Sequence, residues 1–248
     1  HFKNAPPEQN IPLIMALLSV WNTSFLGYTS QAILPYDQSL HMLPAYLQQG
    51  EMESNGKHVN FAGKVVPYTT VPIIWGMTGI NGQHAFYQCL HQGNVIVPAD
   101  FIASVKPQIN VDKHHDILLS NFFAQTEAMM SGVDAEQVTA DLTAKGKSQA
   151  QIDELLNHKI HQGNRPTTSM LLDTVDAKTV GRLIALYEHK IFCQGIILDI
   201  CSFDQWGVEL GKGLASKIES ELTDDSVNHD HDSSTSGLMA YYKQHRTQ

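Results

Sequence analysis

The segment Trp75–His84 carries the first side chain that could do chemistry. An apolar stretch ends at Trp75, a glycine-rich turn follows, and a helix is predicted to begin near Asn81, which puts His84 in its first turn. Free N–H groups and partial positive charge at a helix start favour a neutral imidazole that can accept a proton. A helix-capping turn with an incidental histidine explains the segment equally well, because it lacks the glycine patterns of nucleotide-binding loops.

Glu53 is the second candidate, and it follows a helical stretch on which Gln49 also lies. A carboxylate between a polar loop and a buried sheet is partly desolvated and can then serve as a general base. A single glutamate in a loop is far more often simply exposed to water. The residues alone therefore leave both interpretations of Glu53 open.

The third candidate segment opens the last long predicted helix, 204–222. Gln205, Glu209 and Lys212 follow one another at helical spacing, so the pattern predicts that they line one face beside an apolar stripe. A polar stripe of this kind is ordinarily a solvated helix face. A substrate-contacting face is the alternative.

A metal site is not predicted. His229–Asp232 resembles a metal-binding cluster but lies in a polar segment without a second anchored ligand group, so a solvated loop is the better interpretation. The sequence also lacks the HExxH motif of metalloproteases and the GxSxG motif of serine hydrolases. No metal and no cofactor are expected.

The elements that must position these residues alternate between strand and helix. Apolar, β-branched segments predict buried strands at 71–75, 94–97 and 191–200, and a shorter extended run at 32–35. Helical patterns cover 12–26, 39–49, 81–92, 114–130, 135–144, 150–156, 176–187 and 204–222. The alternation predicts an α/β fold with a parallel sheet flanked by helices, in which ligands lie beyond the carboxyl ends of the strands. A change to polar sequence predicts one domain at 1–222 and a helical C-terminal arm at 223–248.

Composition excludes several classes of function. The 248 residues carry 16 basic and 25 acidic side chains, a net charge of −9, and 42% are hydrophobic, as in a globular protein. A negative chain without basic runs is not expected to bind nucleic acid. The longest apolar run, Ile11–Leu18, is too short to span a membrane. Three cysteines without close spacing favour reduced thiols in a cytoplasmic protein.

Five segments resemble, in the same order along the chain, motifs of the glucose-6-phosphate isomerase family. They are Met52–Lys57, Asn81–Gln88, Gly163–Thr167, Tyr187–Phe192 and Phe203–Lys212. The resemblance extends over effectively the whole chain, and five motifs in order are a specific signal. It implies a cytoplasmic aldose–ketose isomerase built from α/β domains of the sugar-isomerase (SIS) type.

The resemblance also implies the role of each candidate residue in converting glucose 6-phosphate to fructose 6-phosphate. Glu53 would carry the proton between C1 and C2 through a cis-enediol, His84 and Lys212 would assist ring opening, and Gln49 and Gln205 would hold the substrate. An acid/base set of this kind contributes typically about 10²–10⁴ in rate per group. Family members need no metal or nucleotide, and they are homodimers in which the histidine is presented to the neighbouring subunit's site.

The sequence departs from the family pattern in several respects, of which two bear on activity. Met77, Thr78 and Ile80 replace the glutamate, proline and threonine that many members have before the histidine. The family's Gly-Gly-Arg motif and its phosphate-binding Ser/Thr loop precede the matched region and are absent from this chain. We therefore expect this chain to be the C-terminal portion of such an enzyme and to be inactive alone. The alternative is a non-catalytic module or pseudoenzyme that binds sugar phosphates.

Overall fold

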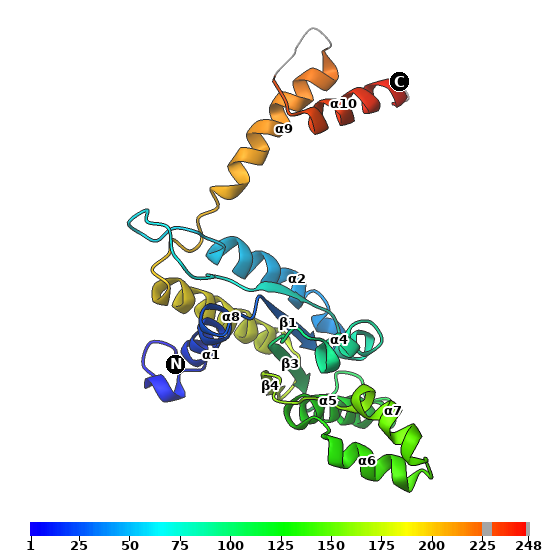
Figure 1. Ribbon diagram of the computed structural model, residues 1–248. Coiled ribbons are helices and arrows are strands. Elements are labelled where there is room, and N and C mark those ends of the chain that lie inside the picture. The colour runs from blue at the N-terminus through cyan, green and yellow to red at the C-terminus, as the bar shows by residue number, and fades with distance from the viewer. Residues whose placement is uncertain (225–229, 247–248) are drawn as a thin grey trace. The chain divides into compact units, whose positions relative to one another are not determined.

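The computed structural model describes residues 1–224 and 230–246. The chain forms two compact units, His1–Phe203 and Asp204–Gln248. All the strands described here belong to the first unit, whereas the second contains two helices (Figure 1). The predicted domain boundary at residue 222 stays a prediction.

Four parallel strands form the sheet of the first unit, in the order β2-β1-β3-β4. Their bounds are β1 Ser30–Pro35, β2 Ile73–Gly76, β3 Ala99–Ser104 and β4 Thr167–Leu172. In the two ladders that β1 forms, Ile33 lies opposite Gly76 of β2 and opposite Asp100 of β3. The predicted α/β fold with a parallel sheet flanked by helices is confirmed.

Helices cover both faces of this sheet because successive side chains of a strand point to opposite faces. On one face, Leu34 and Phe101 pack with residues of α4 (Tyr87–Gln92) and α5 (His114–Ser131). The opposite face carries Ile33, Ile74 and Ile102, which pack against three helices, namely α1 (Ile11–Val20), α2 (Leu43–Leu47) and α8 (Ala177–Ile197). The result is a three-layer arrangement with the core on either side of the sheet (Figure 1).

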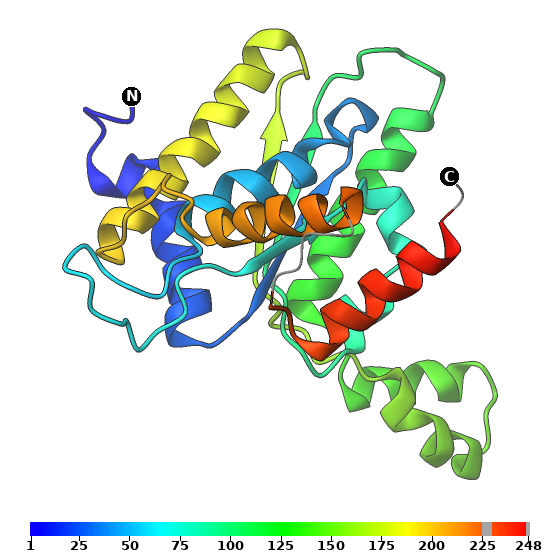
Figure 2. The ribbon, with the colours of Figure 1, turned by 90° about the horizontal axis from the view of Figure 1, so that it is seen from above.

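Two helices of the first unit form a separate hairpin, α6 (Ala135–Ala144) and α7 (Gln149–Lys159). Each begins with a capping box, at Asp134 and at Ser148, in which the side chain and backbone of two residues satisfy each other's hydrogen bonds. The hairpin has its own small apolar cluster of Val138, Leu142 and Ile152. Figures 1 and 2 both show it projecting beyond the sheet.

The second unit contains α9 (Gly207–Thr223) and α10 (Ser233–His245). Within it, Nε2 of His231 lies 2.9 Å from Oε1 of Glu221, and both side chains are largely buried. Of the cluster His229–Asp232, His229 lies outside the described residues. Residues 1–224 and 230–246 contain no group of three or more His, Cys, Asp or Glu that could hold a metal ion.

Several predicted elements are confirmed, and two predicted strands are wrong. The helices predicted at 12–26, 114–130 and 135–144 occur close to their expected bounds. The predicted strand 191–200 is instead largely the end of the 21-residue helix α8, since one helical face from Leu183 onward is buried and outweighs the strand preference of isoleucine. The predicted strand 94–97 is a loop before β3.

Two strands, β3 and β4, were not predicted because polar residues interrupt their apolar pattern. β3 contains Asp100 in an otherwise apolar run, and β4 begins with two threonines and a serine. Both nevertheless lie side by side in the sheet, paired over six residues.

None of the described helices has the length and hydrophobicity that a membrane crossing requires.

Candidate functional site

Glu53 lies at the end of a π-helical turn, η4 (Gln48–Glu53), which directly continues α2. Such wide turns are rare and occur frequently at functional sites. The chain continues from Glu53 into one further helical turn, closed by a hydrogen bond from the Gly56 amide to the Met52 carbonyl. The side chain of Glu53 is partly buried, and Gln49 on the same turn is exposed. The predicted loop glutamate is therefore a helical residue of defined geometry.

Lys57 fixes the main chain at Glu53. Its ammonium group donates hydrogen bonds to the carbonyl oxygens of Glu53, at 2.8 Å, and of Ser54, at 2.7 Å. Carbonyl groups in the last turn of a helix lack partners within the helix, and a cation there satisfies them. The short sequence Glu53–Lys57 thus contains both the candidate base and the side chain that holds its backbone.

A buried ion pair lies directly beneath this turn. The ammonium of Lys190 on α8 is 2.9 Å and 2.8 Å from the two carboxylate oxygens of Glu51, and both side chains are only 1% exposed. This pair was not predicted from the sequence. A signal was available, because Lys190 falls on the buried face of α8 at helical spacing from Leu183 and Tyr187, but the predicted strand concealed it.

A second buried polar contact lies on the same side of the sheet. The hydroxyl of Tyr187 donates a hydrogen bond of 2.9 Å to a carboxylate oxygen of Asp100. Burial raises the pKa of Asp100 above its usual value, although the nearby charge of Lys190 opposes this shift. Burial also raises the pKa of Tyr187, and the adjacent Asp100 carboxylate adds to that effect. The hydroxyl therefore remains a donor at neutral pH.

His84 is not in the first turn of a helix, contrary to the prediction. It is the exposed C-terminal capping residue of the short helix α3 (Gly79–Gln83), and α4 begins only at Tyr87. The predicted single helix is interrupted at Phe86, whose ring packs edge-on against Trp75 with centroids 4.7 Å apart. The argument that a helix start keeps this imidazole neutral does not apply, but the exposed ring is accessible from outside the chain.

Glycines in the turn after β2 permit close packing. Gly79 lies so near the ring of Tyr36 that a Cβ atom there would collide with it. Gly76 has a φ of +151° and lies against the backbone of Ile33 in the neighbouring strand. The glycine-rich sequence between Trp75 and His84 is thus explained by close packing of this turn against β1 and Tyr36. The packed turn in turn determines the position of His84.

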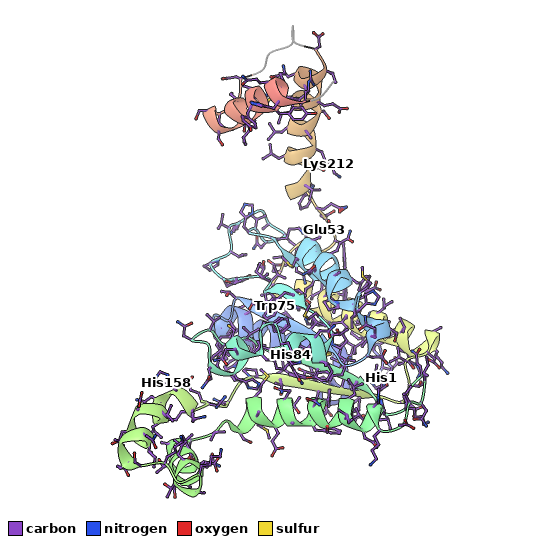
Figure 3. The ribbon with its side chains drawn as sticks, turned by 90° about the vertical axis from the view of Figure 1, so that its right-hand side faces the viewer. His1, Glu53, Trp75, His84, His158 and Lys212 are labelled. Carbon is purple, nitrogen blue, oxygen red and sulfur yellow. The ribbon has the colours of Figure 1, made fainter. Side chains whose placement is uncertain are left out.

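Lys212 and Gln205 lie in the second unit. Lys212 is on α9, as predicted, and its side chain is exposed. Gln205 is also exposed but precedes the helix, which begins at Gly207, so the predicted alignment of Gln205 with Glu209 and Lys212 on one helical face is wrong. Figure 3 labels Lys212, Glu53 and His84 on their respective elements.

Two cavities lie at opposite ends of the strands. One of about 140 Å³ is at the amino ends of the strands, and its lining includes Gln31, Asp100 and Lys190. The other, of about 410 Å³, is at the carboxyl ends of β1 and β3, where Asp37 and Ser104 line it. The linings of these two cavities include neither Glu53 nor His84.

The arrangement suits proton transfer. Glu53 is a partly buried carboxylate on a main chain held by Lys57 and by the buried residues beneath it, and a carboxylate fixed in this way is suited to general-base chemistry. His84 is an exposed imidazole on a separate element, and Figure 3 shows it apart from Glu53. The first unit of one chain therefore presents Glu53 and His84 at two different places.

Comparison with known proteins gives consistent results. A model of the family described as phosphoglucose isomerase matches residues 1–239. The chain is 91% identical over 248 residues to the glucose-6-phosphate isomerase of Pseudoalteromonas translucida (strain TAC 125), and 63% identical over 243 residues to glucose-6-phosphate isomerase 1 of Colwellia psychrerythraea (strain 34H / ATCC BAA-681). The match covers 100% and 98% of this chain but 45% and 44% of those relatives.

A solved structure also matches. The fold is similar to the crystal structure of a glucose-6-phosphate isomerase from Chlamydia trachomatis, with a TM-score of 0.80 and 34% identity, over 98% of this chain and 43% of that one. The chain thus spans less than half the length of the curated relatives it matches.

Proposed function

Since the chain belongs to the phosphoglucose isomerase family, we propose that it supplies catalytic groups to an aldose–ketose isomerase that interconverts glucose 6-phosphate and fructose 6-phosphate. The observation that carries this proposal is the position of Glu53, a partly buried carboxylate on a π-helical turn with its carbonyl held by Lys57. In this function Glu53 removes a proton from one of the two substrate carbons and returns it to the other through a cis-enediol intermediate. A single base can do both because the enediol is planar.

The other candidate residues have roles in the same reaction. His84 and Lys212 exchange protons with the ring oxygen and the anomeric hydroxyl when the sugar ring opens, and Gln49 and Gln205 hold the substrate. In solution, the proposed enzyme is a cytoplasmic homodimer in which His84 serves the site of the partner subunit. The exposure of His84, and its separation from Glu53 in Figure 3, support this exchange. The reaction uses no cofactor.

The anion-binding groups for the substrate phosphate are proposed to come from sequence outside this chain. The chain itself is acidic, with a net charge of −9, and matches less than half of its relatives' length. A chain without these groups would bind the phosphorylated sugar weakly. We therefore expect this chain alone to have little or no isomerase activity in a coupled assay.

A chimera tests the proposal. This sequence would replace the matched residues of the Pseudoalteromonas translucida isomerase, to which it is 91% identical, and turnover would be measured in a coupled assay. We expect turnover near that of the parent isomerase, and Glu53→Gln is expected to lower kcat by at least about 10²-fold, as loss of a general base does. Glu154→Gln, an exposed change on α7, is the matched control and should leave kcat unchanged.

Two results would contradict the proposal. Full activity in Glu53→Gln would remove Glu53 from the reaction. A chimera that binds the sugar phosphate but never turns it over would instead favour the alternative of a non-catalytic binding module, for which the departure at Met77 is the motivating observation.

A further inference from the structure

We infer that Lys190 is a positioning residue for the proposed base, acting through its buried ion pair with Glu51. The inference rests on the proposed function of Glu53. Glu51 lies on η4, two residues before Glu53, and Lys190 lies on α8, 139 residues further along the chain. The ammonium contacts both carboxylate oxygens, at 2.9 Å and 2.8 Å, so the pair fixes the orientation of the carboxylate as well as its distance.

Glu51 has a further buried partner that ties the turn to a third element. The side-chain amide of Gln194, one turn beyond Lys190 on α8, donates a hydrogen bond of 3.0 Å to the same carboxylate. That amide also donates a hydrogen bond of 2.8 Å to the hydroxyl of Ser19 on α1. Lys190 and Gln194 together give the carboxylate three donor contacts, and helices α1 and α8 hold it in one place.

The main chain is anchored to α8 on the far side of Glu53 as well. Asn55, also buried, donates a hydrogen bond of 3.0 Å from its side chain to the carbonyl oxygen of Ile191, the residue next to Lys190. Two successive residues of α8 therefore hold the residues two before and two after Glu53. The base lies between two fixed points, although its own side chain remains partly exposed.

Positioning explains why a charged pair occupies this place. A buried ion pair contributes little to stability compared with well-packed apolar residues, because removing two charges from water is costly. The same pair resists displacement, since moving Glu51 away from Lys190 would leave two buried charges unsatisfied. Displacement of a reacting group by about 1 Å can cost about 10²-fold in rate, so a fixed turn has a direct effect on catalysis.

Activity of the chimera described above provides the first test. Lys190→Met removes the charge and retains most of the side-chain volume, whereas Glu51→Gln is a milder change that keeps the shape and one acceptor oxygen. We expect Lys190→Met to lower kcat by about 10-fold or more, with KM changed less than about threefold, because a mispositioned base affects the reaction more than binding. Glu51→Gln should lower kcat in the same sense by at least about threefold.

Two controls separate positioning from loss of stability. Glu51→Asp keeps the charge, and the long side chain of Lys190 can follow the shorter carboxylate, so this variant should retain kcat within about threefold. Leu183→Ala truncates a buried side chain on the same helix and leaves Glu51, Lys190 and Gln194 in place, so it should lower the melting temperature but leave kcat unchanged. The inference is overturned if folded Lys190→Met and Glu51→Gln keep the parental kcat.

Hydrogen exchange provides a second test that does not depend on isomerase activity. In Glu51→Gln, amides of η4 and the following Ser54–Gly56 should exchange faster, while amides of α5 on the opposite face of the sheet keep their protection. Unchanged exchange in η4 would overturn the inference even if the parent chimera proved inactive. Failure of the proposed function would appear differently, as an inactive parent whose η4 turn still loosens in this variant.

Discussion

The ammonium group of Lys57 donates a hydrogen bond of 2.8 Å to the main-chain carbonyl oxygen of Glu53. The same group reaches the carbonyl of Ser54 at 2.7 Å. A side chain four residues after the proposed base thus fixes the backbone of that base. This contact and the buried pair beneath it act on the same short turn, one from the end of the helix and one from the core.

Replacing Lys57 with methionine is expected to destabilise the fold. The variant loses two charge-assisted hydrogen bonds at a helix end, which corresponds to about 1–3 kcal/mol in the free energy of unfolding. Urea unfolding of the parent and variant chains measures the difference. Lys64→Met is the matched control, because Lys64 is exposed, and it should change the free energy of unfolding by less than about 0.5 kcal/mol. Equal stabilities for Lys57→Met and the parent would show that the contact is not formed in solution.

Replacing Gly79 with alanine is expected to destabilise the turn that leads to His84. The added Cβ would collide with the ring of Tyr36, which is itself buried, so the backbone or the ring must move at a cost of about 1–3 kcal/mol. Thermal unfolding measures the loss. Gly181→Ala is the control on an exposed helical position of α8 with open space around it, and it should stabilise by up to about 1 kcal/mol. A neutral or stabilising effect of Gly79→Ala would contradict the packing described here.

Stability should depend on pH through Asp100. Burial raises the pKa of its carboxyl group above the ordinary value of 3.8, so the folded chain holds this proton more tightly than the unfolded chain does. The resulting contribution to stability is complete below about pH 4 and is lost as the pH rises through the raised pKa. Asp100→Asn removes that dependence, so the stability of the variant relative to the parent should increase as the pH rises from about 4 to 7.

Asp176 supplies a control of opposite sign. It caps α8, and hydrogen bonds from the Thr179 backbone and side chain lower the pKa of its carboxyl group, so its contribution to stability is lost as the pH falls. The stability of Asp176→Asn relative to the parent should therefore increase as the pH falls below about 4. Urea unfolding at several pH values measures both differences. Parallel curves for Asp100→Asn and the parent would refute the assignment to Asp100.

Local patterns were sufficient for many of the helices. The spacing of apolar residues located α5 and α6 almost to the residue, because each buries one face and exposes the other. The turn that contains Glu53 is also held by a neighbour in sequence, since Lys57 donates a hydrogen bond to the Glu53 carbonyl oxygen. The role of Glu53 in a reaction stays a prediction.

Where a helix continues or ends because of contacts with distant residues could not be predicted from local patterns. The apolar run after Lys190 has the composition of a buried strand, yet it completes α8, since a helix beginning at Ala177 continues through it and packs against the sheet. His84 is separated from the next helix because Phe86 packs on Trp75. In both cases tertiary packing determined whether a helix continued or ended.

By itself, the sequence determined the class of fold and nominated Glu53, His84 and Lys212 as candidates for proton transfer, because both inferences depend on side-chain types and on their spacing along the chain. Only the tertiary structure decided that Glu51 and Lys190 form a buried pair under Glu53. The pair joins residues 139 positions apart, and a local pattern reports that a side chain faces the core but not which distant group it meets there.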